Sequence, residues 1–428
     1  MLEAPHFDLL WGAPFAGMLL SIALGPLIAP RAWHHHQGKI ALAWALLVLV
    51  PLALVQGPAA AVHEAAHAVL AEYLPFVILL GTLYVVAGGI HVSIDAPRTP
   101  ALNTALLAGG TLLASLIGTT GAAMLLIRPL LAANAHRRDA AHLVVFYLFL
   151  VANAGGALSP LGDPPLFVGF LQGVPFFWTT RHLAAPTALL CATLLVIFHL
   201  VERHRAGREP IAAAAAPAGP AAGLGLRIRM RGLHNLVLLV LAALAVLSSG
   251  LWTAGRIPEL LGVPLALPSL ARDLALLAIA AASLILTGPS IRAANGFGWA
   301  PIAEVAKLFI GIFVTIGPVV AMLKQGEAGP LGAIARLAES GGQPVPILYF
   351  WLTGLLSAFL DNVPTYLVFF NLAGGDAAQL TGPLSRILAA VSCGAVYMGA
   401  LTYIGNAPNL MVRAIAIERT IRFGALPM

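Results

Sequence analysis

Charged side chains are scarce in this sequence, since Asp, Glu, Lys and Arg together make up only 9% of its 428 residues. A soluble domain usually carries about 25% charged residues. Hydrophobic residues make up 60% of the chain, and so few charges cannot cover a water-facing surface. The composition therefore excludes an ordinary soluble domain and indicates a chain surrounded mostly by lipid.

Cysteine is almost absent as well. Cys191 and Cys393 lie far apart within apolar runs, which excludes a disulfide framework and a CxxC metal site. The N-terminus lacks the basic start and small-residue cleavage site of a signal peptide, so we expect its first apolar run to be retained. The net charge of +6 comes from short basic segments between apolar runs. That distribution is typical of membrane topology, and we expect no nucleic-acid partner.

Apolar runs long enough to cross a bilayer recur along the chain. Single spans are predicted at 10–30, 40–55, 75–92, 183–200, 236–251, 274–286 and 302–323. Helical hairpins are predicted at 101–131 and 347–372, and two longer runs, 140–174 and 385–417, are interrupted by Gly and Pro. The pattern predicts an all-α polytopic membrane protein.

The two interrupted runs are copies of each other. Residues 156–165 (GALSPLGDPP) match residues 399–408 (GALTYIGNAP) at five of ten positions. The same offset aligns the polar clusters of the two hairpins, 114–122 and 357–365. One register that aligns two separate features indicates duplication. We therefore predict two inverted repeats, each with a re-entrant helical hairpin and a broken transmembrane helix.

The basic residues divide the chain and orient it. We predict an N-terminal repeat at 1–201, a basic linker at 202–232 and a C-terminal repeat at 233–428. The linker is rich in Ala, Pro and Gly, which indicates a flexible tether. Basic segments favour the cytoplasm. This places the linker and the C-terminus inside a bacterial cytoplasmic membrane and the N-terminus outside. The second repeat lacks a counterpart of the span 183–200, so a final helix is expected to be absent.

The breaks are the predicted binding site. Inverted repeats with interrupted helices at matching places point to the site of a transporter. Such breaks persist in a membrane only where protein, water or an ion satisfies the freed backbone groups. Backbone carbonyls and carboxylates suit Na⁺, and helix N-termini suit anions. The alternative is that the breaks are merely kinks in packed helices.

Two carboxylates, Asp163 and Asp361, lie in these breaks with no cation next to them in sequence. A buried carboxylate there is costly unless it protonates or pairs with a cation, which is the alternation that a proton/cation exchanger needs. The alternative role is helix N-capping. Neutral oxygens near the two acids come from Thr119, Thr120, Asn362 and Thr365.

Two further groups of charged residues have competing interpretations. Glu304 and Lys307 share a helix face, so they are either a structural ion pair or candidates for proton coupling, as Asp163 and Asp361 are. Residues 63–67 (HEAAH) match the zinc-protease pattern HExxH, which supports an intramembrane metalloprotease with Asp163 as a further ligand. Against this hypothesis, the segment is predicted to lie between spans, and the repeat stays unexplained. We expect a protein that is not an enzyme and has no cofactor.

The hairpin and break motifs resemble those of the ion transporter superfamily, in particular the NhaD-type and CitMHS-like sodium:proton antiporter branch. The motifs are SLIGTTGAAMLLIRP (115–129), LSPLGDPPLFVGFLQGVPFFW (158–178), EVAKLFIGIF (304–313), SAFLDNVPTYLVFFNLAGGD (357–376) and YIGNAPNLMV (403–412). The superfamily also includes citrate transporters, arsenite permeases and dicarboxylate/sodium symporters. The symporters carry Ser-Asn-Thr at both hairpin tips. The tips here differ from that signature, which favours the antiporter branch.

The resemblance implies a scaffold with a mobile transport domain, elevator-type alternating access and a homodimer. It also implies two cation or substrate sites, with Na⁺ at the hairpin tips. One site comprises Gly118, Thr119, Thr120, Ser159, Gly162 and Asp163, and the other comprises Asp361, Asn362, Thr365, Thr402, Gly405 and Asn406.

The function expected from this sequence is sodium (or lithium)/proton antiport across the lipid bilayer. The alternatives are cation-coupled transport of citrate or a similar organic anion, arsenite efflux and, more remotely, the zinc protease. The substrate is therefore expected to be a small inorganic ion or an organic anion.

Overall fold

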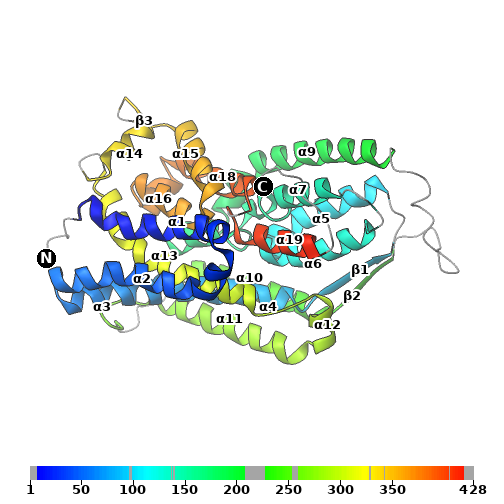
Figure 1. The fold of residues 1–428 in the computed structure, drawn as a ribbon, viewed down its shortest axis with the longest axis horizontal. Coiled ribbons are helices and arrows are strands. Elements are labelled where there is room, and N and C mark those ends of the chain that lie inside the picture. Colours follow the sequence, from blue (N-terminus) through cyan, green and yellow to red (C-terminus); the bar gives the residue numbers. More distant parts are fainter. Residues whose placement is uncertain are drawn as a thin grey trace.

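The computed structural model describes residues 7–95, 99–135, 137, 140–207, 227–252, 259–326, 329–341, 343–403 and 405–418. Of the described residues, 79% are helical. The described residues include nine helices that are long and apolar enough to cross a membrane, together with shorter apolar helices. The prediction of an all-α polytopic membrane protein is confirmed (Figure 1).

The first helices are long and largely exposed to lipid. A 3₁₀ turn (Leu9–Gly12) leads into α1 (Ala13–Ile28), and α2 follows (Pro30–Gln56). Gly57, with φ of 95°, allows the turn into α3 (Pro58–His67). The π-helical turn η2 (Ala68–Tyr73) joins α3 to α4 (Leu74–Ala87).

These last three elements form one continuous candidate span, residues 58–87. The segment HEAAH, predicted to be a separate stretch between spans, is instead part of the continuous helix that forms this candidate span. The helix continues up to Pro75 because η2 uses the wider i→i+5 pattern, as in the bond from Leu74 N to Val69 O. Phe76 of α4 stacks on Phe309, 4.6 Å between ring centroids, which joins this span to a later helix.

The first hairpin and the first broken helix follow. Their elements are β1 (His91–Asp95), α5 (Pro100–Ile117), α6 (Thr119–Ala133), α7 (Ala141–Leu150), η3 (Ala154–Leu158), α8 (Pro164–Leu171) and α9 (Trp178–Ala206). The hairpin turns at Gly118, whose φ of 82° is a conformation that favours glycine.

The second half begins with β2 (Arg227–Arg231), which pairs antiparallel with β1. Its helices are α10 (His234–Leu251), α11 (Leu267–Leu286), α12 (Pro289–Ala294), α13 (Ala300–Leu323), α14 (Gly332–Leu337), α15 (Pro346–Phe359), α16 (Asn362–Leu372), α17 (Ala377–Thr381), α18 (Ser385–Met398) and α19 (Ala407–Glu418). The short strands β3 (Glu339–Ser340) and β4 (Gln343–Pro344) precede α15, and the 3₁₀ turn η6 (Gly399–Leu401) separates α18 from α19. Figure 1 shows α5 and α6 in one half of the long axis and α15 and α16 in the other.

The same contacts recur in the two halves. Ser159 Oγ donates a hydrogen bond to the carbonyl of Ser115, and Thr402 Oγ1 donates to the carbonyl of Ala358 at the matching position. A Cβ at Gly162 would lie 2.1 Å from the carbonyl oxygen of Gly156. The equivalent atoms at Gly405 and Gly399 would be 2.6 Å apart. Both broken helices therefore require glycine where the chain folds back on itself.

The predicted linker 202–232 carries regular structure at both ends. Glu202 lies in the last turns of α9, and residues 227–231 are strand β2. Residues 208–226, which include the Ala- and Pro-rich stretch, lie outside the described residues. The segment after Glu418, where a final helix was expected to be absent, lies outside them as well.

Candidate functional site

A buried carboxylate lies where the four interrupted elements meet. Asp163, 1% exposed, precedes α8 in the first broken helix. Its Oδ1 accepts hydrogen bonds from Thr119 Oγ1 at 3.2 Å and from Asn406 Nδ2 at 3.1 Å. Its Oδ2 accepts from Asn362 Nδ2 at 2.8 Å. The three donors come from the first hairpin tip, the second broken helix and the second hairpin tip.

The backbone around Asp163 is shaped by its neighbours in the chain. Thr119 N donates to the carbonyl of Gly162 at 2.7 Å, which ties the first hairpin tip to the first broken helix. Asp163 is extended (φ −127°, ψ 137°), and Pro164 and Pro165 begin α8 where missing N–H groups do no harm. The chain thus presents the carboxylate at the break.

The two aspartates differ in their capping role. The side chain of Asp163 makes no capping hydrogen bond to α8. The side chain of Asp361, in contrast, caps α16 by accepting from Val363 N at 3.0 Å. Capping therefore accounts for part of the role of Asp361 and leaves Asp163 unexplained.

Two asparagines extend this cluster, and sequence reasoning did not place them in the site. Asn153 Oδ1 accepts from Asn406 Nδ2 at 3.1 Å, and Asn153 Nδ2 donates to Asn409 Oδ1 at 2.8 Å. Asn409 Nδ2 donates to the carbonyls of Gly399 at 2.9 Å and of Thr402 at 3.0 Å. A signal existed for Asn409, because Asn406 and Asn409 are three residues apart beside the break.

The Asp163 cluster contains oxygen atoms without partners. The side-chain oxygens Oδ1 of Asn362 and Asn406 are buried and accept no hydrogen bond from the described residues. None of the ion pairs found among those residues involves Asp163. Buried polar oxygens are normally satisfied. A carboxylate surrounded by neutral groups and unpartnered oxygens has the chemistry of a site for H⁺ or a small hard cation.

A cavity of about 660 Å³ adjoins this cluster. The first turns of four interrupted helices line it through Thr120 of α6, Pro164 of α8, Asn362 of α16 and Ala407 of α19. Its charged lining residues are Arg128, Glu304, Asp361 and Arg413. Helix N-termini carry partial positive charge, so together with the two arginines they give an anion positive groups to contact, against the two carboxylates of the same lining.

The sequence predicted two separate sites, one for each set of residues. In the structure, members of both sets lie together. Thr119 and Asp163 of the first predicted set lie with Asn362 and Asn406 of the second around one carboxylate. Thr120 and Asp361 line the adjoining cavity. The remaining predicted residues support the backbone: Gly118, Ser159, Gly162, Thr365, Thr402 and Gly405.

Glu304 and Lys307 do not form the structural ion pair that their spacing allows, since the ion pairs of the described residues do not include them. Glu304 lines the cavity. The side chain of Lys307 lies against α2, where a Cβ at Gly38 would be 3.5 Å from its Cδ.

Among the described residues, no set of metal ligands surrounds the HExxH segment. The described part of the chain contains no group of three or more His, Cys, Asp and Glu side chains that could hold a metal ion. Glu64 lies instead against α13, where a Cβ at Gly317 would meet its carboxylate oxygen. This arrangement places the segment at a helix contact.

Interrupted helices that meet inside a bundle of membrane-spanning helices define a secondary transporter. The family model CitMHS_2, described as "Putative citrate transport", matches residues 4–426, so the chain belongs to this family of CitMHS-like transporters. No curated protein matches the chain. The match supports the CitMHS part of the predicted resemblance and does not extend to the NhaD-type antiporter branch.

Proposed function

We propose that this protein is a secondary active transporter that couples the movement of a citrate-like organic anion to that of Na⁺ or H⁺. The observation that carries the proposal is the cavity lined by four helix N-termini and by Arg128 and Arg413. Arginine side chains and helix N-termini are donors that carboxylates prefer. The family to which the chain belongs is consistent with this substrate class.

The coupling cation occupies the Asp163 cluster in this proposal. Asp163 supplies negative charge, and the nearby amide oxygens of Asn362 and Asn406 supply neutral ligands. Na⁺ and H⁺ both neutralise a carboxylate, so either serves as the coupling ion.

Electrostatic repulsion links the two ligands. Asp163 lies beside the anion cavity and Asp361 lines it, so both carboxylates repel an incoming organic anion until a cation neutralises them. Cation binding therefore raises anion affinity, and linkage requires that the anion raise cation affinity by the same factor. Elevator-type movement of the hairpins and broken helices then carries both ligands across the membrane.

Sodium (or lithium)/proton antiport is the second candidate. It is favoured by Asp163 and Asp361, which lie in the breaks and take part in none of the described ion pairs. A carboxylate of this kind exchanges H⁺ for Na⁺ without an organic anion.

Proteoliposomes distinguish the two functions. We expect uptake of radiolabelled citrate when an inward Na⁺ or H⁺ gradient is imposed, and loss of uptake in Arg128→Gln. The matched control is Asp376→Asn, which removes an exposed capping aspartate at the start of α17. Proton flux on addition of Na⁺ in the absence of any organic anion, with no citrate uptake, would establish the antiport function and reject the lead proposal.

A further inference from the structure

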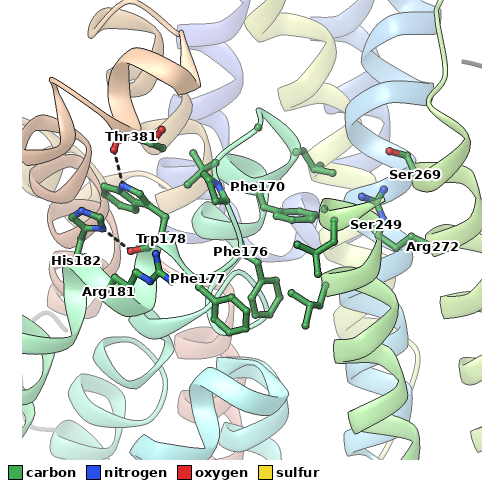
Figure 2. Close-up of a pocket in the computed structure, with 17 residues that line it drawn as sticks. Phe170, Phe176, Phe177, Trp178, Arg181, His182, Ser249, Ser269, Arg272 and Thr381 are labelled. Carbon is green, nitrogen blue, oxygen red and sulfur yellow. Dashed lines mark hydrogen bonds between the residues drawn. The ribbon is translucent and has the colours of Figure 1, made fainter. Parts of the chain in front are cut away.

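A second cavity, also of about 660 Å³, lies away from the Asp163 cluster (Figure 2). One wall is the end of α8 and the turn that leads to α9, with Phe170, Phe176 and Phe177. The other wall is formed by the end of α10 and the start of α11, with Ser249, Ser269 and Arg272. Neither the family nor the proposed transport reaction accounts for this cavity.

Arg272 is the unusual group in its lining. Its side chain is 2% exposed, and its Nε donates to Asp273 Oδ1 at 2.8 Å. The guanidinium carbon lies 5.7 Å from the centre of the Phe167 ring. Its Nη2 is buried and has no hydrogen-bond partner among the described residues. Figure 2 shows the guanidinium extending from α11 toward Phe170. An unsatisfied, charged donor is costly to bury, so an acceptor is expected here.

The rest of the lining is apolar on one side and basic at the mouth. Phe177 is 49% exposed and Leu251 is 74% exposed, so an apolar surface continues outward from the cavity. Arg181 and His182 lie at the other side, and both are exposed. The described residues that line the cavity include Arg181 and Arg272 and no acid, and Asp273, which pairs with Arg272, offsets one of the two positive charges.

The position along the membrane spans identifies the kind of ligand. The cavity lies at the end of one candidate span, 234–251, and at the start of the next, 267–286. Trp178 lines it, and Trp252, 48% exposed, follows α10 directly. Tryptophan and arginine at the ends of spans are typical of the head-group region of a bilayer. A ligand there has an anionic head beside an apolar chain.

We propose that this cavity binds the phosphate head group of a membrane phospholipid. Arg272 Nη2 donates to a phosphate oxygen, and Arg181 adds positive charge at the mouth. The acyl chains lie against Phe176, Phe177 and Leu251. Because α8 starts directly after Asp163 and ends in this cavity, a bound lipid contacts both the α8 segment and helices α10 and α11.

The test uses delipidated protein in a neutral detergent, with thermal unfolding as the readout. Dioleoylphosphatidylglycerol is expected to raise the Tm of the wild type. Dioleoylglycerol, which lacks phosphate, and millimolar inorganic phosphate, which lacks the chains, are expected to leave it unchanged. The double variant Arg272→Gln with Asp273→Asn removes both members of the ion pair, so no buried charge is left unpaired.

In that double variant we expect the lipid concentration for half-maximal stabilisation to rise at least about tenfold, because a charge-assisted hydrogen bond is lost. Arg181→Gln changes an exposed side chain that the fold tolerates, and we expect a rise of about 2–5-fold. Arg203→Gln, an exposed arginine at the far end of α9, is the matched control and should behave as wild type.

Three results would overturn the proposal. One is equal stabilisation of wild type and Arg181→Gln together with an unchanged response of the double variant. The second is full stabilisation by dioleoylglycerol, which would show that the cavity binds the acyl chains and does not recognise the phosphate. The third is full stabilisation by inorganic phosphate alone, which would identify a free-anion site. If the double variant does not fold, the Arg181→Gln comparison and the two partial ligands decide the outcome.

Discussion

Two buried carboxylates in the first half of the chain, Asp163 and Glu202, have opposite surroundings. The carboxylate of Glu202, 0% exposed, accepts hydrogen bonds from Arg137 Nη1, His142 Nε2 and Asn103 Nδ2, each at 2.7 Å. Among the described residues, the side chain of Asp163, 1% exposed, accepts hydrogen bonds from one hydroxyl and two amides and from no charged group. The two carboxylates are equally buried, but Glu202 has a cationic partner, Arg137, whereas Asp163 is bonded to neutral groups.

This difference in partners separates a carboxylate that stabilises the fold from one that is available for transport. A carboxylate with its own arginine is neutralised permanently, and the Glu202 cluster ties α9 to the open end of the first hairpin. A carboxylate with neutral donors alone remains available to a mobile cation. We therefore assign Glu202 to stability and propose Asp163 for transport, and the following experiments separate the two roles.

The largest effect is expected for Asp163→Asn. The substitution keeps the size of the side chain and removes the charge that holds the cation, so coupled uptake should fall at least about 100-fold, equivalent to about 3 kcal/mol. Uptake is measured in proteoliposomes, and the thermal unfolding curve should stay within a few degrees of wild type. Retention of Na⁺- or H⁺-driven flux in this variant contradicts the assignment of Asp163.

The second effect concerns stability. Glu202→Gln removes one member of the buried Arg137–Glu202 ion pair, which is expected to destabilise the fold by about 3 kcal/mol. The Tm in detergent measures this loss, and the cation dependence of the remaining transport should be unchanged. A normal Tm combined with altered coupling would reverse the roles of the two carboxylates.

The third effect is stabilisation by the cation itself. Na⁺ at 100 times its dissociation constant should stabilise the wild type by about 2.7 kcal/mol, and Glu202→Gln by the same amount. Asp163→Asn should show no such increase. The measurement is the Tm at increasing concentrations of Na⁺, Li⁺ or K⁺, and K⁺ controls for ionic strength. Equal stabilisation of all three proteins would place the cation elsewhere.

The smallest effect is expected for Asn406→Ala. Its amide donates to Asp163 at 3.1 Å and to Asn153 at 3.1 Å, so its loss should weaken cation binding by about 1 kcal/mol, roughly fivefold. The comparison is Asn371→Ala, which changes a buried asparagine of α16 whose amide donates to the carbonyl of Leu367 in its own helix. If both variants bind Na⁺ as the wild type does, Asn406 has no part in the site.

Much of the fold was predictable because its determinants are local. Apolar runs, glycine at the first hairpin tip and Gly-Pro breaks act over a few residues, so the hairpins and broken helices were predicted close to their observed bounds. The continuous helix over 58–87 was not predicted, because a π-turn that accommodates Pro75 leaves no clear pattern in the sequence.

The site was predictable only in part. Asp163 stood out because a carboxylate is rare within apolar sequence. The sequence did not single out Asn153, Arg128 or Arg413 for the site, since an asparagine or arginine near a span end has many ordinary roles. Glu202 was assigned to a linker, and its burial follows from the approach of Arg137 and His142, which are distant in sequence.

The sequence by itself determined that this chain resides in a membrane, that its helices are interrupted at matching places, and that an acid lies in each pair of breaks. These properties depend on composition and on short segments. Only the tertiary structure decided that the breaks of both halves meet at one carboxylate, and that Glu202 pairs with an arginine whereas Asp163 takes part in none of the ion pairs of the described residues. Which side chains neutralise a buried charge depends on contacts between segments far apart in the chain, and no local pattern records them.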